Sequence, residues 1–199
     1  MKNLNLFTIE NGVLMSCNDK TVKNVVIPDC VTKIDDKAFY GCVYLKSIVI
    51  PDSVTEIGNV AFAYCESFKS IVIPNSVTRI GDCAFAYCDL LESITIPDSV
   101  TEIGTGIFYE CESLKEIKML DGVTEIGKAE FAYCKSLESI EIPDSVTKIG
   151  DGAFYGCSSL NKITIPRGDT EIFEKAFAHC KSLESIVING EEWSVLAKK

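Results

Sequence analysis

Hydrophobic and polar residues alternate over a short stretch, break at a proline, and then repeat this pattern along the chain. In LKSIVIPDSVTEIGNVAFAYCES, residues 45–67, Ile48 and Ile50 belong to the alternating stretch and Pro51 follows it. This pattern predicts a short β-strand that proline ends, because proline has no amide hydrogen to donate. The β-branched patch VTEIG is a candidate for a second strand, and AFAYC is long enough for only one helical or 3₁₀ turn.

The unit recurs every 23 residues without insertion or deletion from residue 21 to residue 188. Phenylalanine returns at positions 39, 62, 85, 108, 131, 154 and 177, and a cysteine follows three residues after each. One unit cannot bury its apolar face, whereas stacked units can, with each strand pairing to its equivalent in the next repeat. We therefore predict parallel strands centred near residues 26, 49, 72, 95, 118, 141, 164 and 187, with the VTEIG segments as a second sheet on the opposite wall. Equivalent positions in successive repeats are called a column below.

The two ends of such a stack need caps. Asn11-Gly12 lies between two apolar stretches, which predicts a β-hairpin over residues 4–16. At the other end, Trp193, Leu196 and Ala197 have the spacing of one helix face. We therefore divide one structural domain into an N-terminal hairpin cap (1–20), a solenoid (21–188) and a C-terminal cap helix (189–199).

The repeat resembles a known family. LKSIVIPDSV fits the leucine-rich-repeat frame L-x-x-L-x-L-x-x-N-x-L, with serine in place of asparagine, and IPDSVTEIGNVAFAYCESFKSI closely resembles the 23-residue repeats of the BspA-like class. The resemblance covers residues 21–188. It implies an α/β fold, namely a right-handed leucine-rich-repeat solenoid with short parallel strands and short helical or 3₁₀ turns. It also implies protein binding, since many BspA-like proteins are surface proteins of host-associated bacteria that bind host molecules.

Composition and charge narrow the range of partners. The 199 residues are 47% hydrophobic, which suits one globular domain, and the net charge is −10. Because no run of Lys or Arg forms a basic face, we expect neither nucleic acid nor an anionic membrane as a partner. We also expect no membrane insertion, since no apolar run approaches about 20 residues. The start does not read as a secretory signal, so we expect a cytoplasmic protein, or a cell-surface protein if a leader has been removed.

The residues that could carry chemistry have structural explanations. Of the ten cysteines, seven lie in one column, where side chains pointing in parallel disfavour disulfides and favour buried thiols. The single histidine, His179, occupies a surface column, and the chain has no zinc spacing, phosphate loop or nucleophile motif. Carboxylates alternate with basic residues between repeats, as in Lys69, Glu92 and Lys115. We therefore expect no cofactor, no metal and no enzyme activity; catalysis is the less favoured alternative.

The outward positions of the first sheet, expected to be concave, are the candidate partner-binding face. Its residues are Val49, Val72, Thr95, Glu116, Lys118, Glu141, Lys162 and Thr164. We predict a monomeric module that binds a protein partner there, with a cell-surface adhesin or host-protein-binding protein as the alternative reading. End-to-end association of the stack is the alternative to a monomer. Strand propensity alone also explains exposed β-branched residues.

Two irregularities interrupt the repeat. In residues 114–131, Leu120 replaces the proline and Glu130 occupies a column that is otherwise alanine or isoleucine. We interpret this irregularity as drift in a redundant array, with a functional role as the alternative. Near the C-terminus, Arg167-Gly168-Asp169 is a tripeptide that integrin-type receptors read. Its Asp169 falls in a column of inward valines. Since an unpaired buried carboxylate is costly, we expect either that the backbone swings outward there or that the last repeats are loosened, with Phe173 filling the vacated space. We interpret the tripeptide as a worn repeat rather than an adhesion motif.

Overall fold

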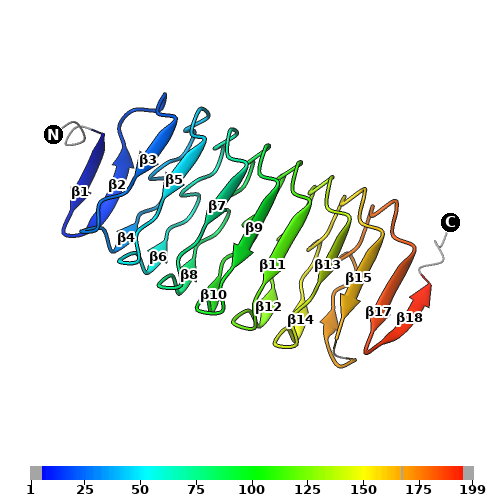
Figure 1. The fold of residues 1–199 in the computed structure, drawn as a ribbon. Helices are drawn as coiled ribbons and strands as arrows, with labels where there is room; N and C mark the ends of the chain where they lie inside the picture. The colour runs from blue at the N-terminus through cyan, green and yellow to red at the C-terminus, as the bar shows by residue number, and fades with distance from the viewer. Residues whose placement is uncertain (1–5, 167, 195–199) are drawn as a thin grey trace.

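The computed structural model describes residues 6–166 and 168–194, which wind into an elongated β-solenoid (Figure 1). One wall, named here the strand sheet, holds the eight predicted strands. They are β3 (Asn24–Val26), β5 (Ser47–Val49), β7 (Ser70–Val72), β9 (Ser93–Ile96), β11 (Glu116–Met119), β13 (Ser139–Glu141), β15 (Lys162–Ile165) and β17 (Ser185–Ile188). Within the groups β3–β5, β7–β9–β11 and β13–β15–β17, neighbours pair in parallel one repeat apart in register, as Ile94 opposite Ile117 illustrates. Between β5 and β7, and between β11 and β13, the strands lie side by side without ladder pairing.

The VTEIG segments form the predicted second parallel sheet. Its strands are β4 (Lys33–Ile34), β6 (Glu56–Ile57), β8 (Arg79–Ile80), β10 (Glu102–Ile103), β12 (Glu125–Ile126), β14 (Lys148–Ile149) and β16 (Glu171–Ile172). The sheet is interrupted between β10 and β12, so that β12, β14 and β16 form a separate group.

The third wall consists of turns, which corrects the α/β expectation, because the described residues contain no helix or 3₁₀ segment. Each regular repeat carries two left-handed residues four positions apart, such as Val60 (φ 49°) and Tyr64 (φ 60°). A helix cannot accommodate them, since left-handed backbone conformations occur as single residues. Instead, alternate amides bond to the next repeat, as from Phe62 to the Ala84 carbonyl at 2.8 Å.

Columns of identical side chains fill the core between the walls. The seven phenylalanines of the column stack with ring centroids 5.1–5.9 Å apart and planes within 2–13°. Beside them, each thiol of the cysteine column from Cys65 onward donates to the phenylalanine carbonyl of the preceding repeat, as Cys88 does to Phe62 at 3.3 Å. The seven cysteines of this column are free thiols, six of them buried and Cys180 half-buried, in line with the prediction of a column of buried thiols.

The two ends are capped on different sheets. β1 (Phe7–Glu10) and β2 (Val13–Cys17) form the predicted antiparallel hairpin around Asn11-Gly12, and β2 then pairs with β4 of the second sheet. At the other end, β18 (Glu191–Ser194) pairs antiparallel with β17 of the strand sheet. A helix over 189–199 is therefore wrong for residues 191–194, whose backbone pairs instead; Leu196 and Ala197 lie outside the described residues.

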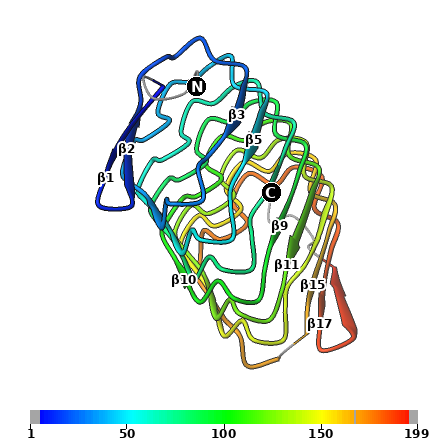
Figure 2. The same ribbon diagram turned by 60° about the vertical axis from the view of Figure 1, so that its left-hand side comes forward.

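The stack runs nearly straight from β3 to β17, and an oblique view shows its turns as nested outlines of similar shape (Figures 1 and 2). The concavity expected for the strand sheet is not seen. Near the C-terminus, Asp169 is exposed while Val146, one repeat earlier in the same column, is buried, so the Asp169 carboxylate does not enter the core. Phe173 does not fill the space: it is 39% exposed and lies 5.4 Å from the Lys148 ammonium. Arg167 lies outside the described residues.

Candidate functional site

The outer surface of the strand sheet, named here the strand face, begins with a row of exposed valines. Val26, Val49 and Val72 are 62%, 56% and 79% exposed because strand alternation turns them outward while Ile48 and Ile71 enter the core. Apolar side chains this exposed in an ordered row gain free energy when a partner covers them. The row ends at Thr95, where polar and charged residues begin.

A shallow hollow of about 470 Å³ crosses β7, β9 and β11 at this boundary. Val72, Thr95, Glu116 and Lys118 line it, so the structure brings four of the eight predicted residues together. Thr95 stands directly opposite Lys118 in the parallel register, and Leu120 closes one end of the hollow. The hollow therefore combines an apolar side wall with one carboxylate and one ammonium group.

A second hollow of about 400 Å³ adjoins the first, and Leu120 lines both. Glu141 lines this second hollow beside Met119. The other three predicted residues line neither hollow: Val49 lies on β5, and Lys162 and Thr164 lie on β15. The eight residues are thus spread along one face rather than gathered into one pocket.

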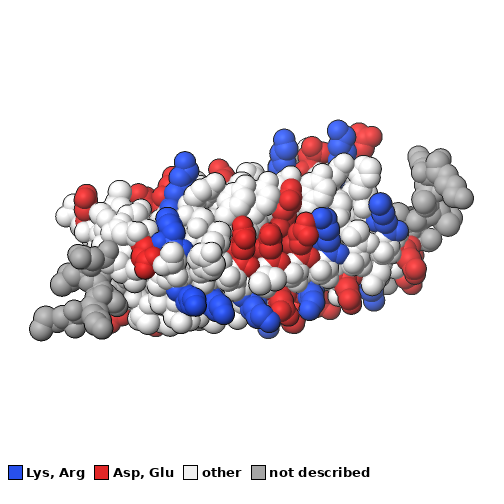
Figure 3. All heavy atoms as spheres, turned by 90° about the horizontal axis from the view of Figure 1, so that it is seen from above, with Lys and Arg blue, Asp and Glu red and all other residues white. Residues whose placement is uncertain are grey.

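Opposite charges alternate along the margin of the stack, as predicted. Glu92 lies 3.5 Å from the Lys69 ammonium and 3.4 Å from that of Lys115, and these cations lower the pKa of the Glu92 carboxyl. Viewed from above, acidic side chains gather about midway along the stack with basic ones on either side (Figure 3). Such exposed pairs fix register and specificity more than they stabilise the fold.

The thiols and the histidine are held in structural roles. Burial raises the pKa of Cys65 to about 12 and that of Cys180 to about 11, which keeps both protonated at neutral pH and poor as nucleophiles. Cys17 differs, because a hydrogen bond with the Cys42 thiol lowers its pKa to about 7. His179 is exposed and lies against the Tyr155 ring at 4.8 Å. Within the described ranges, no cluster of His, Cys, Asp and Glu is arranged to hold a metal ion.

Sequence reasoning missed one site, the interruption between β10 and β12. An open hollow of about 410 Å³ extends from there across β10 to β8, with Arg79, Glu102 and Glu125 among its lining residues. Two signals are visible in the sequence. Glu102 and Glu125 are successive members of a column in which charges otherwise alternate, and Glu130 stands in an alanine column. In the structure, Glu130 is buried beside this interruption.

A family model and several solved structures of leucine-rich repeat proteins match this chain. The model of the BspA type leucine rich repeat region matches residues 7–138 and 78–195. A leucine-rich repeat protein of T. pallidum is similar, with 32% identity, a TM-score of 0.79, and coverage of 86% of this chain and 82% of that protein. A leucine rich cell surface protein of Faecalibacterium prausnitzii shares 32% identity and a TM-score of 0.61 over 85% of this chain and 60% of its own length.

The pneumococcal vaccine antigen PcpA is also similar, with 25% identity and a TM-score of 0.56 over 83% of this chain. The chain spans 60% of the Faecalibacterium protein and 50% of PcpA, which is less than two thirds of either. No functionally curated protein matches it. Among the described residues, no helix has the length and apolar character needed to cross a bilayer. The chain belongs to the BspA-type leucine-rich repeat family.

Proposed function

We propose that this chain is a non-catalytic protein-binding module that captures a partner on its strand face, at the surface of a bacterial cell. The observation that carries the proposal is the hollow across β7, β9 and β11, where the most exposed valine, Val72, adjoins Glu116 and Lys118. A preformed apolar area rimmed by charges is what a protein interface requires, because the apolar area supplies free energy and the charges supply specificity.

The cell-surface setting rests on the relatives. The Faecalibacterium protein is a cell surface protein and PcpA is a vaccine antigen. This setting replaces the cytoplasm as the favoured location and makes host proteins the favoured class of partner. Treating intact cells of the native organism with protease tests it: a surface protein is degraded while cells remain whole, and a cytoplasmic one is spared.

Site-specific photo-crosslinking tests the binding face. A photoreactive phenylalanine replaces Val72 in one protein and Thr78, exposed on the second sheet, in a matched control. Incubation with host-cell surface proteins should give adducts from position 72 that position 78 does not give. Val72→Glu should weaken capture of the crosslinked partner at least about 10-fold, since a charge enters an apolar contact, whereas Thr78→Glu should not. Equal adducts from both positions, or unchanged capture by Val72→Glu, would refute this face.

Lys118→Glu and Glu141→Lys refine the same test. Both side chains are exposed, so neither substitution should lower the melting temperature. Each should slow association with the partner, because charges at an interface margin act mainly on the encounter rate. Association unaffected by either reversal would confine the interface to the valine row.

A further inference from the structure

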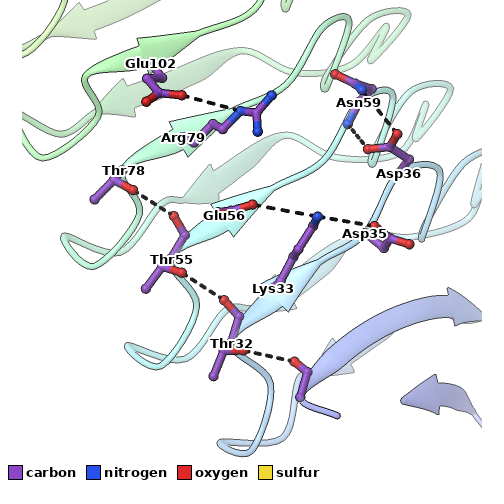
Figure 4. Close-up of polar contacts among 11 residues, drawn as sticks. Thr32, Lys33, Asp35, Asp36, Thr55, Glu56, Asn59, Thr78, Arg79 and Glu102 are labelled. Carbon is purple, nitrogen blue, oxygen red and sulfur yellow. Dashed lines mark hydrogen bonds and ion pairs between the residues drawn. The ribbon is translucent and has the colours of Figure 1, made fainter. Parts of the chain in front are cut away.

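The N-terminal hairpin is joined to the first repeat by the same kind of short contacts that join one repeat to the next. β2 pairs with β4 over two residues, and the Thr32 amide donates to the Gly12 carbonyl at 2.8 Å. The Thr32 hydroxyl donates to the same carbonyl at 3.4 Å, as the Thr55 hydroxyl does to the Thr32 carbonyl at 3.2 Å (Figure 4). Since an end element has a neighbour on one side only, this cap is expected to open before any interior repeat.

Two thiols meet where this cap contacts the first repeat. Cys17 ends β2, and its amide donates to the Ala38 carbonyl at 2.7 Å, while the Cys42 amide donates to the Phe39 carbonyl at 3.0 Å. Both cysteines are therefore anchored to neighbouring residues of one turn. Their side chains are buried, and the two thiols are hydrogen-bonded to each other. Because Cys17 belongs to the cap and Cys42 to the first repeat, a bond between the two sulfur atoms would join these parts covalently.

A cation lies against this pair of thiols. The Lys20 ammonium is 3.7 Å from the Cys42 sulfur, and because Lys20 is exposed, its side chain reaches from solvent to the pair. The hydrogen bond with the Cys42 thiol, aided by attraction to this ammonium, lowers the pKa of Cys17 to about 7. The same hydrogen bond raises the pKa of Cys42. A large share of Cys17 is therefore thiolate at neutral pH, which is the form that attacks disulfides.

Two interior cysteines show what distinguishes the pair at the cap. Cys88 and Cys111 occupy successive repeats, and their thiols also share a hydrogen bond. Both are fully buried with repeats on either side, and burial raises the pKa of Cys88 well above its ordinary value. Their side chains point in parallel, which opposes the dihedral angle of a disulfide. Cys17 lies outside the cysteine column and is not held in that parallel arrangement. Thiol reactivity is therefore expected at the cap and not in the interior of the column.

We propose that Cys17 and Cys42 form a redox modification site that reacts with low-molecular-weight disulfides and bonds the cap to the first repeat. The Cys17 thiolate attacks one sulfur of the reagent R–S–S–R and expels R–S⁻, which takes up the proton that Cys17 released. The Cys42 sulfur then attacks the Cys17 sulfur and expels the second R–S⁻, which takes the Cys42 proton, while the Lys20 ammonium stabilises the charge developing on Cys42. Two protein thiols are oxidised and one reagent disulfide is reduced to two thiols.

The bridge acts on the stability of the stack. It closes the segment between Cys17 and Cys42 into a loop, which restricts the unfolded chain and prevents the cap from separating from the first repeat. Oxidising surroundings therefore lock the cap, and an excess of thiols releases it. The site lies at the N-terminal end of the stack, whereas the hollow of the strand face crosses β7, β9 and β11, so the two do not depend on each other.

Oxidised glutathione is the probe for this site. The folded full-length protein is incubated with it at neutral pH, the remaining thiols are alkylated, and the peptides are mapped by mass spectrometry. We expect one internal disulfide, between Cys17 and Cys42, while Cys88 and Cys111 stay reduced. Exposed Cys30 should carry a mixed disulfide with glutathione, which shows that the reagent is active. Bridging should raise the melting temperature by at least about 5 °C, and excess dithiothreitol should reverse the rise.

Matched variants make the test decisive. Cys17→Ser should abolish both the bridge and the rise in melting temperature, whereas Cys88→Ser should change neither. Lys20→Gln, at an exposed position that should not affect folding, should slow bridging at least about 3-fold, and Lys20→Arg should restore most of the rate, because a cation beside the sulfur stabilises the thiolate. The proposal is overturned by a mixed disulfide at Cys17 without a bridge, by interior bridges that form equally fast, by an unchanged melting temperature, or by a rate that Lys20→Gln does not alter.

Discussion

The junctions on either side of β10 are built from the same repeat and differ in almost every contact of the second sheet. Between β8 and β10, Gly104 donates to the Ile80 carbonyl at 2.8 Å and Arg79 pairs with Glu102. Between β10 and β12 the equivalent amide of Gly127 is unpaired within the described residues, and two glutamates face each other. The alanine column differs at the two junctions: Ala84 and Ile107 meet between β8 and β10, which is closed, whereas the two bulky residues Ile107 and Glu130 meet between β10 and β12, which is open.

The other two walls pass this point without interruption. β9 and β11 remain paired, the Phe108 amide donates to the Glu130 carbonyl at 3.1 Å, and the Phe108 and Phe131 rings stack at 5.6 Å. The opening is therefore confined to one wall. Because repeats contact only their neighbours, one column can change locally while the others maintain the stack.

The largest expected effect on stability comes from placing a glutamate in the alanine column beside the closed junction between β8 and β10. Ala84→Glu places a carboxyl in a fully buried position beside a sheet that has no gap to accommodate it. We expect the free energy of unfolding to fall by about 3–5 kcal/mol, the cost of an uncompensated buried charge. Denaturant titration measures it, with exposed Thr78→Glu as the control. A loss under about 1 kcal/mol, a size usual for surface changes, would show that the acid does not open the sheet.

Glycine-to-alanine exchanges compare the spacing of the two junctions directly. The added methyl of Gly81→Ala would lie 2.6 Å from the Asn59 amide nitrogen, whereas that of Gly127→Ala meets no backbone atom closer than 3.5 Å. The first should therefore cost about 1–3 kcal/mol by overpacking. The second should be nearly neutral, since the Glu130 side chain, at 3.0 Å, can shift. Equal losses in thermal unfolding would contradict the open spacing.

The pH dependence of stability isolates the acid itself. Burial raises the pKa of Glu130 well above its ordinary value of 4.5, so the folded protein holds this proton more tightly than the unfolded chain. The contribution of Glu130 is therefore full below pH 4.5. It is lost as the pH rises from there toward the folded pKa, by about 1.4 kcal/mol of unfolding free energy per pH unit.

Glu130→Gln removes that loss. The variant should gain stability relative to the parent between pH 4.5 and pH 8 in denaturant titrations, while Glu174→Gln, an exposed acid, should follow the parent. A constant difference between the Glu130 variant and the parent across this range would mean that Glu130 titrates normally in the folded state.

The strands, the two sheets and the N-terminal hairpin were predictable because they follow from period, alternation and Asn-Gly. The third wall was not, because AFAYC has helical composition and only its tertiary setting places Tyr64 in a left-handed conformation that bonds to the next repeat. The predicted C-terminal helix is wrong at Trp193 for a similar reason: the residue has helical spacing with Leu196, but its backbone pairs with the edge of β17. On the strand face, residues could be assigned from alternation, but the hollow depends on side-chain packing across three repeats.

The surface charges should contribute the smallest difference between the junctions. Arg79→Gln removes an ion pair at 3.6 Å whose side chains are 55% and 73% exposed, so the melting temperature should fall only slightly and the fall should vanish in 1 M salt, where the screening length is about 3 Å. Glu125→Gln also removes a pair, to Lys148 at 2.8 Å, but it relieves repulsion from Glu102 across the open junction. Loss of the Lys148 ion pair and relief of the Glu102 repulsion oppose each other, so Glu125→Gln should change the melting temperature less than Arg79→Gln does. A clear loss from Glu125→Gln at low salt would show that Glu102 does not act on Glu125 across this junction.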